Sequence, residues 1–137
     1  MTSMPSYLNL SGYFSNAVKT RIIIPTYNER ENIISLIDEL FRLVPEDTSI
    51  LVADDGSPDG TARLIRDYMR KDSRVSLIER PGKLGMGSAY QAAFRWVLNE
   101  RGDDYIVTMD ADFSHNPKYV PELVKECGSH DLVIGSR

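Results

Sequence analysis

The sequence has a single cysteine, no long apolar run and no signal for export. Cys127 cannot form an internal disulfide, and its place in a predicted helix favours a buried thiol. No apolar stretch approaches the ~20 residues that span a bilayer, and the first residues lack the basic start and apolar core of a secretory signal. These absences predict a cytoplasmic protein whose own chain does not cross a membrane.

An excess of positive charge is also missing. The 137 residues carry 20 Asp and Glu against 16 Lys and Arg, a formal net charge of -4. There is therefore no electrostatic reason to expect nucleic acid as a partner. The length fits one domain, and the hydrophobic fraction of 42% is that of an ordinary globular protein.

A regular pattern begins near residue 20. Residues 1–19 show no clear period and are predicted to be an N-terminal arm, followed by one domain over residues 20–137. In that domain short apolar runs alternate with segments of helical periodicity. The predicted strands are Ile22–Ile24, which Pro25 ends, Ile50–Ala53, Val75–Ile78, Tyr105–Met109 and Leu132–Ile134. The alternation predicts an α/β fold, with a mainly parallel sheet and helices on both faces.

Four helices are predicted between these strands. Asn28 and Glu31 have the spacing of a capping box before the first helix. The predicted core-facing residues are Ile33, Ile37, Leu40, Phe41 and Val44 in the first helix, Leu64, Ile65, Tyr68 and Met69 in the second, and Phe94, Val97 and Leu98 in a third over Ala89–Arg101. The fourth helix is predicted over Pro117–Cys127, with Gly128 beyond its end.

Acidic residues follow two of the predicted strands. Asp54, Asp55 and Asp59 follow the second strand, and Asp110 and Asp112 follow the fourth. Carboxyl ends of parallel strands meet at one edge of a sheet, so we expect several of these carboxylates to gather around one crevice. Like charges so close would raise one another's pKa unless a cation lay between them. Hard oxygen ligands suit Mg²⁺ or Mn²⁺, which typically keep waters and bridge to substrate phosphates.

The surroundings of these aspartates carry more information than the Asp-Ala-Asp triplet, which by itself is more often a solvated strand end. The triplet lies in MDADFSHNP directly after a predicted buried strand, while PTYNE follows the first strand and DDGSPDGT the second. With these motifs, residues 21–137 resemble family 2 glycosyltransferases of the Rossmann-like GT-A fold. They are most similar to the dolichyl-phosphate (polyprenyl-phosphate) mannosyltransferases.

The resemblance implies a nucleotide pocket in the first two loops. It is carried by Pro25, Tyr27 and Glu29 of PTYNE and by Ala53 and Asp55 at the end of the second strand, which would hold guanosine. Without the motif, Tyr27 and Glu29 are a loop aromatic and an acid in the first helical turn, where it favours the helix dipole.

The DADFS segment of the family contacts the donor phosphates and the metal. The resemblance therefore implicates Asp110, Ala111 and Asp112, with Ser114 as a further metal ligand. Some relatives have Gln at the position of Ser114, and water is the alternative ligand there. Arg137 matches a family arginine that contacts phosphate at the active site, so Asp112 and Arg137 are the predicted catalytic residues.

Three neighbouring features stay open to a structural interpretation. Strand alternation turns Asp54 away from Asp55, so we expect it to bond loop backbone. His115 has the side chain of a catalytic residue but equally suits stabilisation of its turn. Gly85 and Gly87 resemble the family's glycine-bearing turn, although two glycines alone are weak support for phosphate binding.

The implied reaction moves mannose from GDP-mannose to a polyprenyl phosphate and inverts the anomeric carbon. We expect the chain to lack the C-terminal part of the family domain, so contact with a membrane surface would involve parts missing from it. The chain would then be inactive or nearly so by itself. The alternatives are a transferase for glucose or another hexose, a nucleotide-binding fragment without activity, and a receiver-like signalling domain, against which PTYNE argues.

Overall fold

Four parallel strands form the centre of the structure, a computed structural model that describes residues 18–136. The strands are β1 (Thr20–Thr26), β2 (Thr48–Asp54), β3 (Val75–Glu79) and β4 (Tyr105–Thr108). Their order across the sheet is β3-β2-β1-β4. The predicted parallel α/β sheet is therefore confirmed. Most of the predicted arm, residues 1–17, lies outside the described residues, as does Arg137.

Both faces of the central strands are buried. Ile22 and Ile24 of β1 pack into one hydrophobic core and Ile23 into the opposite core, and all three are 0% exposed. Burial on both sides is why this strand is an unbroken β-branched run. Pro25 does not end β1 as predicted. It lies in register with Ala53 of β2, and proline keeps an extended backbone there although it has no N–H to donate.

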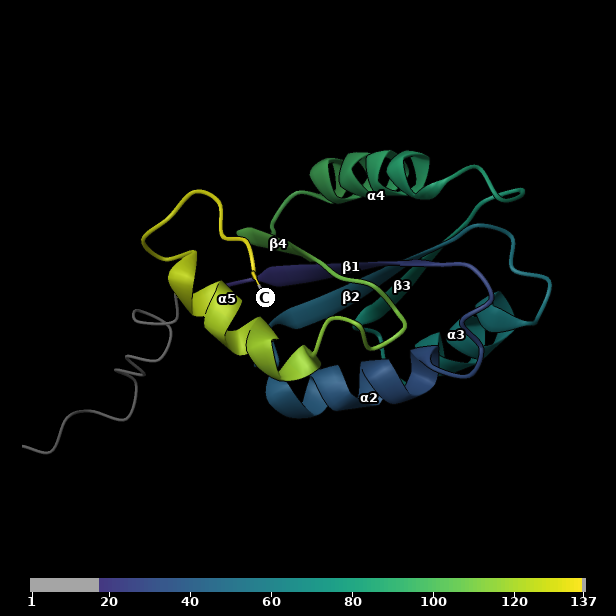
Figure 1. The fold of residues 1–137 in the computed structure, drawn as a ribbon, viewed down its shortest axis with the longest axis horizontal. Coiled ribbons are helices and arrows are strands. Elements are labelled where there is room, and N and C mark those ends of the chain that lie inside the picture. Colours follow the sequence, from purple (N-terminus) through teal and green to yellow (C-terminus); the bar gives the residue numbers. More distant parts are fainter. Residues whose placement is uncertain (1–17, 137) are drawn as a thin grey trace, which may run out of the picture.

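Helices cover the two faces of the sheet unequally (Figure 1). Helices α2 (Ile33–Leu43), α3 (Thr61–Met69) and α5 (Val120–Glu126) lie on one face, with the 3-10 turn η1 (Pro117–Tyr119) leading into α5. The other face is covered by α4 (Met86–Glu100). None of the helices within residues 18–136 combines the length and the apolarity needed to span a bilayer.

The predicted capping box of α2 does not form. Asn28 has a left-handed backbone with φ of 55°, and the helix begins only at Ile33, five positions later. The carbonyl of Glu29 accepts from the N–H groups of Asn32 and Ile33 instead. The Asn32 side chain also donates to the Glu29 carboxylate at 3.1 Å. The local motif fails because Asn28 is held by contacts to another loop.

The buried face of α4 differs from the predicted one. Phe94 is 37% exposed and Leu98 68% exposed, whereas Ala89, Ala93 and Val97 are buried against the sheet. Residues four apart share one face of a helix, and small side chains let the helix approach the strands closely. The predicted inward position is therefore correct for Val97 and wrong for Phe94 and Leu98.

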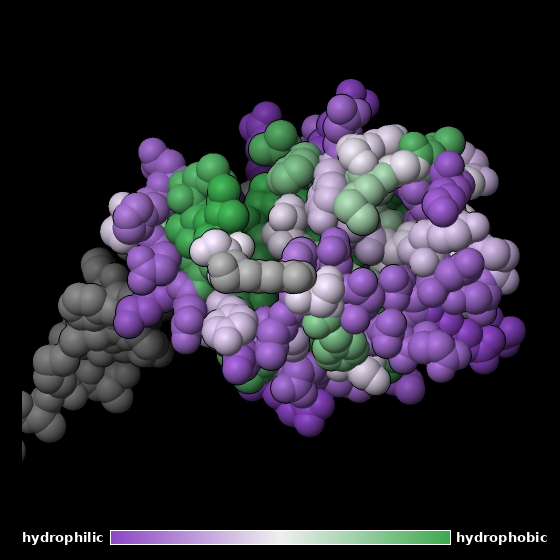
Figure 2. All heavy atoms as spheres, viewed as in Figure 1, coloured by the Kyte–Doolittle hydropathy of each residue, from purple (hydrophilic) through white to green (hydrophobic). Residues whose placement is uncertain are grey.

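Three further predictions near helix ends or the C-terminus are also corrected. Met69 is 36% exposed at the end of α3, and Cys127 is half-buried at the end of α5. Residues 132–134 form no strand, and Leu132 and Ile134 are each 76% exposed. Figure 2 shows apolar side chains gathered over this segment after α5. An apolar run alone does not define a strand when no neighbouring strand pairs with it.

Candidate functional site

The strand order creates a switch point beside β1. β2 and β3 extend the sheet on one side of β1, and β4 lies on its other side. Ligands of parallel sheets bind outside the carboxyl ends of the strands at such a point. A pocket of about 250 Å³ lies there. It is lined by Pro25, Thr26, Tyr27 and Glu29, by Asp55, by Lys83, Gly85, Met86 and Ala89, and by Asp110, Ala111 and Asp112.

The structure brings together most of the residues predicted from the motifs. Those that line the pocket are Pro25, Tyr27, Glu29, Asp55, Asp110, Ala111 and Asp112. Ala53 does not line it, because its side chain is 0% exposed in the core beneath α4. Ser114 is exposed on the loop after β4, outside the pocket lining. Arg137 lies outside the described residues.

The loops after β1 and β2 are joined by hydrogen bonds from backbone to side chain. The N–H of Asn28 donates to the Ser57 hydroxyl at 2.9 Å, and the N–H of Glu29 donates to the Thr61 hydroxyl at 3.1 Å. These bonds fix the backbone that carries Tyr27 and Glu29. The two loops therefore form one wall of the pocket rather than two independent segments.

Asp54 stabilises this wall from its buried side. It is 1% exposed, and its carboxylate accepts from the Thr26 hydroxyl at 2.7 Å and from the N–H and hydroxyl of Ser57 at 2.9 and 2.6 Å. The expectation that Asp54 bonds loop backbone is confirmed by the bond from the Ser57 N–H. Asp54 is thus a structural residue and does not line the crevice.

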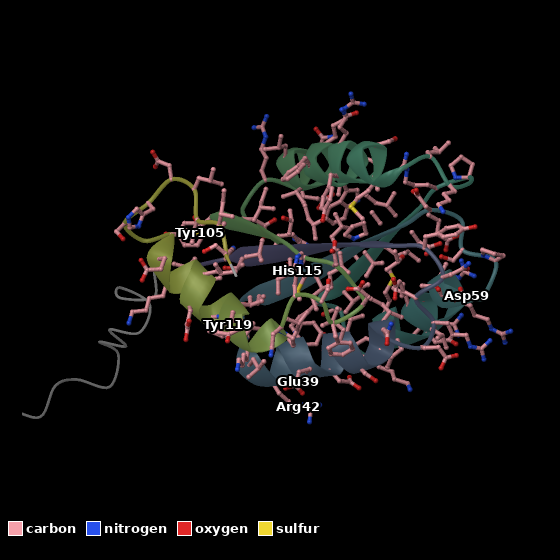
Figure 3. The ribbon with its side chains drawn as sticks, in the orientation of Figure 1. Glu39, Arg42, Asp59, Tyr105, His115 and Tyr119 are labelled. Carbon is pink, nitrogen blue, oxygen red and sulfur yellow. The ribbon has the colours of Figure 1, made fainter. Side chains whose placement is uncertain are left out.

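Asp59 also serves the loop rather than the crevice. Its carboxylate accepts from the hydroxyl and N–H of Thr61 at 2.5 and 3.0 Å, and from the N–H of Arg30 at 3.1 Å. Burial by itself raises the pKa of Asp59, but these hydrogen bonds outweigh it and lower the pKa below its ordinary value. Figure 3 shows Asp59 at the start of α3, well away from His115. The expectation that several carboxylates gather in one crevice holds for Asp55, Asp110 and Asp112, but Asp59 is not among them.

A buried ion pair forms the next wall, and its cation is a residue that the sequence reasoning missed. Arg80 follows β3, and its guanidinium contacts the Asp55 carboxylate at 2.8 Å, with both side chains 7% exposed. The other Asp55 oxygen accepts from the N–H of Gly85 at 3.1 Å. Arg80 also donates to the Gly85 carbonyl and to the Ser88 hydroxyl. Its position at the carboxyl end of a strand was the available signal.

The loop after β4 carries the paired carboxylates. Asp110 is partly exposed and Asp112 exposed, and both face the pocket. The hydroxyl and N–H of Ser114 donate to Asp112 and hold the pKa of Asp112 below its ordinary value, so this carboxylate is ionised at neutral pH. Burial and the charge of Asp110 raise the pKa of Tyr90 on α4, although a hydrogen bond with Thr108 lowers it in part.

His115 closes this loop. Its Nδ1 accepts from the N–H of Asp110 at 3.0 Å, so the ring proton lies on Nε2 when the ring is neutral. Nε2 is 3.9 Å from the Asp110 carboxylate. Figure 3 shows the ring beside the loop after β4. Of the two interpretations of His115, the structure supports stabilisation of the turn.

The carboxylate pair fits a divalent cation of the Mg²⁺ or Mn²⁺ type. Within residues 18–136 there is no group of three His, Cys, Asp or Glu side chains placed to hold a metal. Mg²⁺ does not require such a group, because it is usually bound by one or two carboxylates together with waters and substrate phosphates. Asp110 and Asp112 on one pocket wall meet that requirement.

Comparison with known families identifies the chain. Residues 21–137 match the family described as Glycosyl transferase family 2, a span that begins in β1 and includes every residue that lines the pocket. The chain belongs to glycosyltransferase family 2. The family resemblance carried by PTYNE, DDGSPDGT and MDADFSHNP is thus confirmed.

Curated relatives of this family 2 glycosyltransferase chain have related names. It is 48% identical over 115 residues to an undecaprenyl-phosphate mannosyltransferase of Micrococcus luteus, covering 84% of this chain and 46% of the relative. It is 45% identical over 122 residues to a polyprenol monophosphomannose synthase of Mycolicibacterium smegmatis, covering 87% of this chain and 45% of the relative. The chain thus spans about half the length of these relatives.

Solved structures support the GT-A fold of this family 2 glycosyltransferase. The mannosyltransferase PcManGT from Pyrobaculum calidifontis, in complex with GDP-Man and Mn²⁺, has a TM-score of 0.60 at 26% identity, covering 69% of this chain and 27% of that chain. Glucosyl-3-phosphoglycerate synthase from Mycobacterium tuberculosis, in complex with Mn²⁺ and UDP, has a TM-score of 0.63 at 23% identity, covering 96% of this chain and 47% of that chain. The second likeness shows the fold alone.

Proposed function

We propose that this chain is the nucleotide-sugar-binding part of an inverting mannosyltransferase that moves mannose from GDP-mannose to a polyprenyl (dolichyl) phosphate. The observation that carries the proposal is one pocket at the β1/β4 switch point. It places Tyr27, Glu29 and Asp55 on one side and the carboxylates of Asp110 and Asp112 on the other. The names of the two curated relatives support mannosyl transfer to a polyprenyl phosphate.

The first side of the pocket is suited to a nucleoside. Tyr27 offers an exposed aromatic ring beside the partly exposed carboxylate of Glu29 and the buried carboxylate of Asp55. Ionised carboxylates only accept hydrogen bonds, and the Watson–Crick edge of guanine carries neighbouring N–H donors. A GDP-Man complex in the structural neighbour PcManGT supports guanosine as the nucleoside. Pro25 would shape the same side of the pocket.

The second side is suited to the diphosphate. Asp110 and Asp112 would hold Mg²⁺ or Mn²⁺, which when bound would offset the charge that develops on the departing diphosphate. Ala111 lies between them in the chain, is 2% exposed and lines the same pocket. Ser114 orients Asp112 through its N–H at 3.0 Å, so water is the better candidate for a further ligand. Arg137 as a phosphate ligand stays a prediction.

The acceptor chemistry explains why no strong base is needed in the pocket. A phosphate monoester has a second pKa near ~6 and is mostly a dianion at neutral pH. Catalysis then rests on positioning of the two substrates and on electrostatic stabilisation. Because the acceptor carries a lipid tail, the reaction would take place at a membrane surface, with the protein peripheral to its cytoplasmic face.

Base preference tests this proposal most simply. In a competition panel of GDP, UDP and ADP in the presence of Mn²⁺, we expect GDP to bind most tightly. A clear preference for UDP would overturn the GDP-mannose assignment and favour a transferase for glucose or a related hexose. Calorimetric titration of the chain with each nucleotide gives the three affinities.

A further inference from the structure

The turn between β3 and α4 is anchored at both of its ends. Gly56 has φ of 69°, and a Cβ built on it would lie 3.0 Å from the Cα of Gly82, so the two backbones are in close contact. At the other end, the N–H of Gly85 donates to Asp55. Lys83 lies between these two anchors, so its backbone is held while its side chain extends into the pocket lining.

The Lys83 side chain crosses from this turn to the loop after β1. Its Nζ lies 4.5 Å from the centroid of the Tyr27 ring, a cation–π contact at the mouth of the pocket. Both side chains are exposed and both line the pocket. The Tyr27 ring face is therefore covered by an ammonium group.

The charge of the pocket is unbalanced. Its lining includes the carboxylates of Glu29, Asp110 and Asp112, together with that of Asp55, whose charge Arg80 offsets. Within residues 18–136, Lys83 is the only Lys or Arg in that lining. A nucleoside diphosphate adds further negative charge, and a divalent cation on Asp110 and Asp112 offsets only part of the total. An exposed ammonium in the same pocket lining is suited to bind phosphate oxygens as a point charge.

We propose that Lys83 is a binding residue for the diphosphate of the donor, and that it leaves the Tyr27 ring for the phosphate oxygens when the nucleotide enters. An exposed cation–π contact is weaker than a charge-assisted hydrogen bond to phosphate, so the exchange is favourable. It also uncovers the ring of Tyr27 for the nucleoside. This inference rests on the proposed function, because it requires a nucleoside diphosphate in the pocket.

The test compares GDP with guanosine, which lacks the phosphates, by calorimetry in Mn²⁺. For Lys83→Met we expect the affinity for GDP to fall about tenfold and the affinity for guanosine to be unchanged or slightly higher, because the Tyr27 ring is uncovered. Lys83→Arg should keep most of the GDP affinity. Lys71→Met is the matched control. Lys71 is exposed between α3 and β3, at the amino end of β3 and so at the opposite end of that strand from the pocket. Its loss should leave both affinities unchanged.

The possible outcomes separate this inference from the proposed function. If the unmodified chain does not bind GDP, both the proposed function and this inference are overturned. If the unmodified chain binds GDP and Lys83→Met binds it equally well, only the assignment of Lys83 is overturned. Equal losses for GDP and guanosine would also overturn it, because Lys83 would then act through the shape of the pocket rather than on phosphate.

Discussion

The two sides of the pocket are built in different ways. The nucleoside side comprises residues 25–30, 54–61 and 80–85. Hydrogen bonds join these segments although they are far apart in the sequence, such as Asn28 to Ser57 and Arg80 to Asp55. The metal side, residues 110–116, is held by bonds within itself, from Asp110 to His115 and from Ser114 to Asp112. One side depends on the whole fold, and the other is a local loop.

This difference has consequences for stability and ligand binding. Bonds between distant segments break only when several elements separate, so the nucleoside side should open with the core of the domain. The metal side follows the edge strand β4, and Phe113 within it has φ of 63° and is 40% exposed. We therefore infer that the nucleoside side is preformed, whereas the metal side is held only by its own local bonds.

The largest effect is expected at the buried ion pair of the nucleoside side. Arg80→Met leaves the Asp55 carboxylate buried without its partner, which should lower the free energy of unfolding by about 3–5 kcal/mol. Urea unfolding measures the loss. The double variant Asp55→Asn with Arg80→Met should recover much of it, because no uncompensated charge remains. A loss below about 1 kcal/mol in the single variant would contradict the structural role of the pair.

The next effect concerns the close approach of two loops. Gly56→Ala places a methyl group 3.0 Å from the Gly82 backbone at a residue with φ of 69°, so we expect a loss of about 1–3 kcal/mol in urea unfolding. Gly87→Ala is the matched control. Gly87 lies in α4 with nothing within 4 Å of an added Cβ, and alanine there should be neutral or stabilising. Equal losses in both variants would show that the close approach is unimportant.

A smaller, pH-dependent effect is expected at Asp59. Its folded-state pKa is lowered, so its contribution to stability is present above the unfolded value of 3.8 and is lost as the pH falls through the lower folded value. Asp59→Asn should therefore cost about 1 kcal/mol at pH 7, and the difference from the unmodified chain should shrink in acid. Urea unfolding at several pH values from neutral to strongly acidic checks this. A constant difference would argue against ionisation as its source.

The smallest effect on stability is expected on the metal side. Asp112→Asn should change the free energy of unfolding of the metal-free chain by no more than about 0.5 kcal/mol, since Asp112 is exposed and bonded only within its loop. The same change should remove most of the gain in GDP affinity that Mn²⁺ provides. A large drop in the melting temperature of the metal-free variant would instead mean that Asp112 is mainly structural.

The sheet could be predicted from sequence because its strands are buried on both faces. The run Ile22 to Ile24 has no solvent-facing position, and such runs are distinctive. Because these runs mark where the strands end, the aspartates at the carboxyl ends of β2 and β4 could also be predicted from sequence. Strand alternation also separated the role of Asp54 from that of Asp55. Sequence could not place Asp59, because its carboxylate is engaged by the N–H of Arg30 in another loop.

The remaining errors come from contacts between distant segments. Arg80 pairs with a residue 25 positions earlier, and no local pattern records that pairing. The capping box failed because the N–H of Asn28 donates to Ser57. Phe94 and Leu98 were placed inward for their size, whereas the close approach of α4 to the sheet uses Ala89 and Ala93. In each case tertiary packing decided between locally reasonable alternatives.

Calorimetric titration of the unmodified chain with guanosine and with GDP, each in EDTA and in Mn²⁺, tests the central claim most directly. A preformed nucleoside side predicts the same guanosine affinity in both conditions. A metal side that acts on the diphosphate predicts GDP binding at least about tenfold tighter in Mn²⁺ than in EDTA. Equal GDP affinity in the two conditions, or guanosine binding that requires Mn²⁺, would contradict the account.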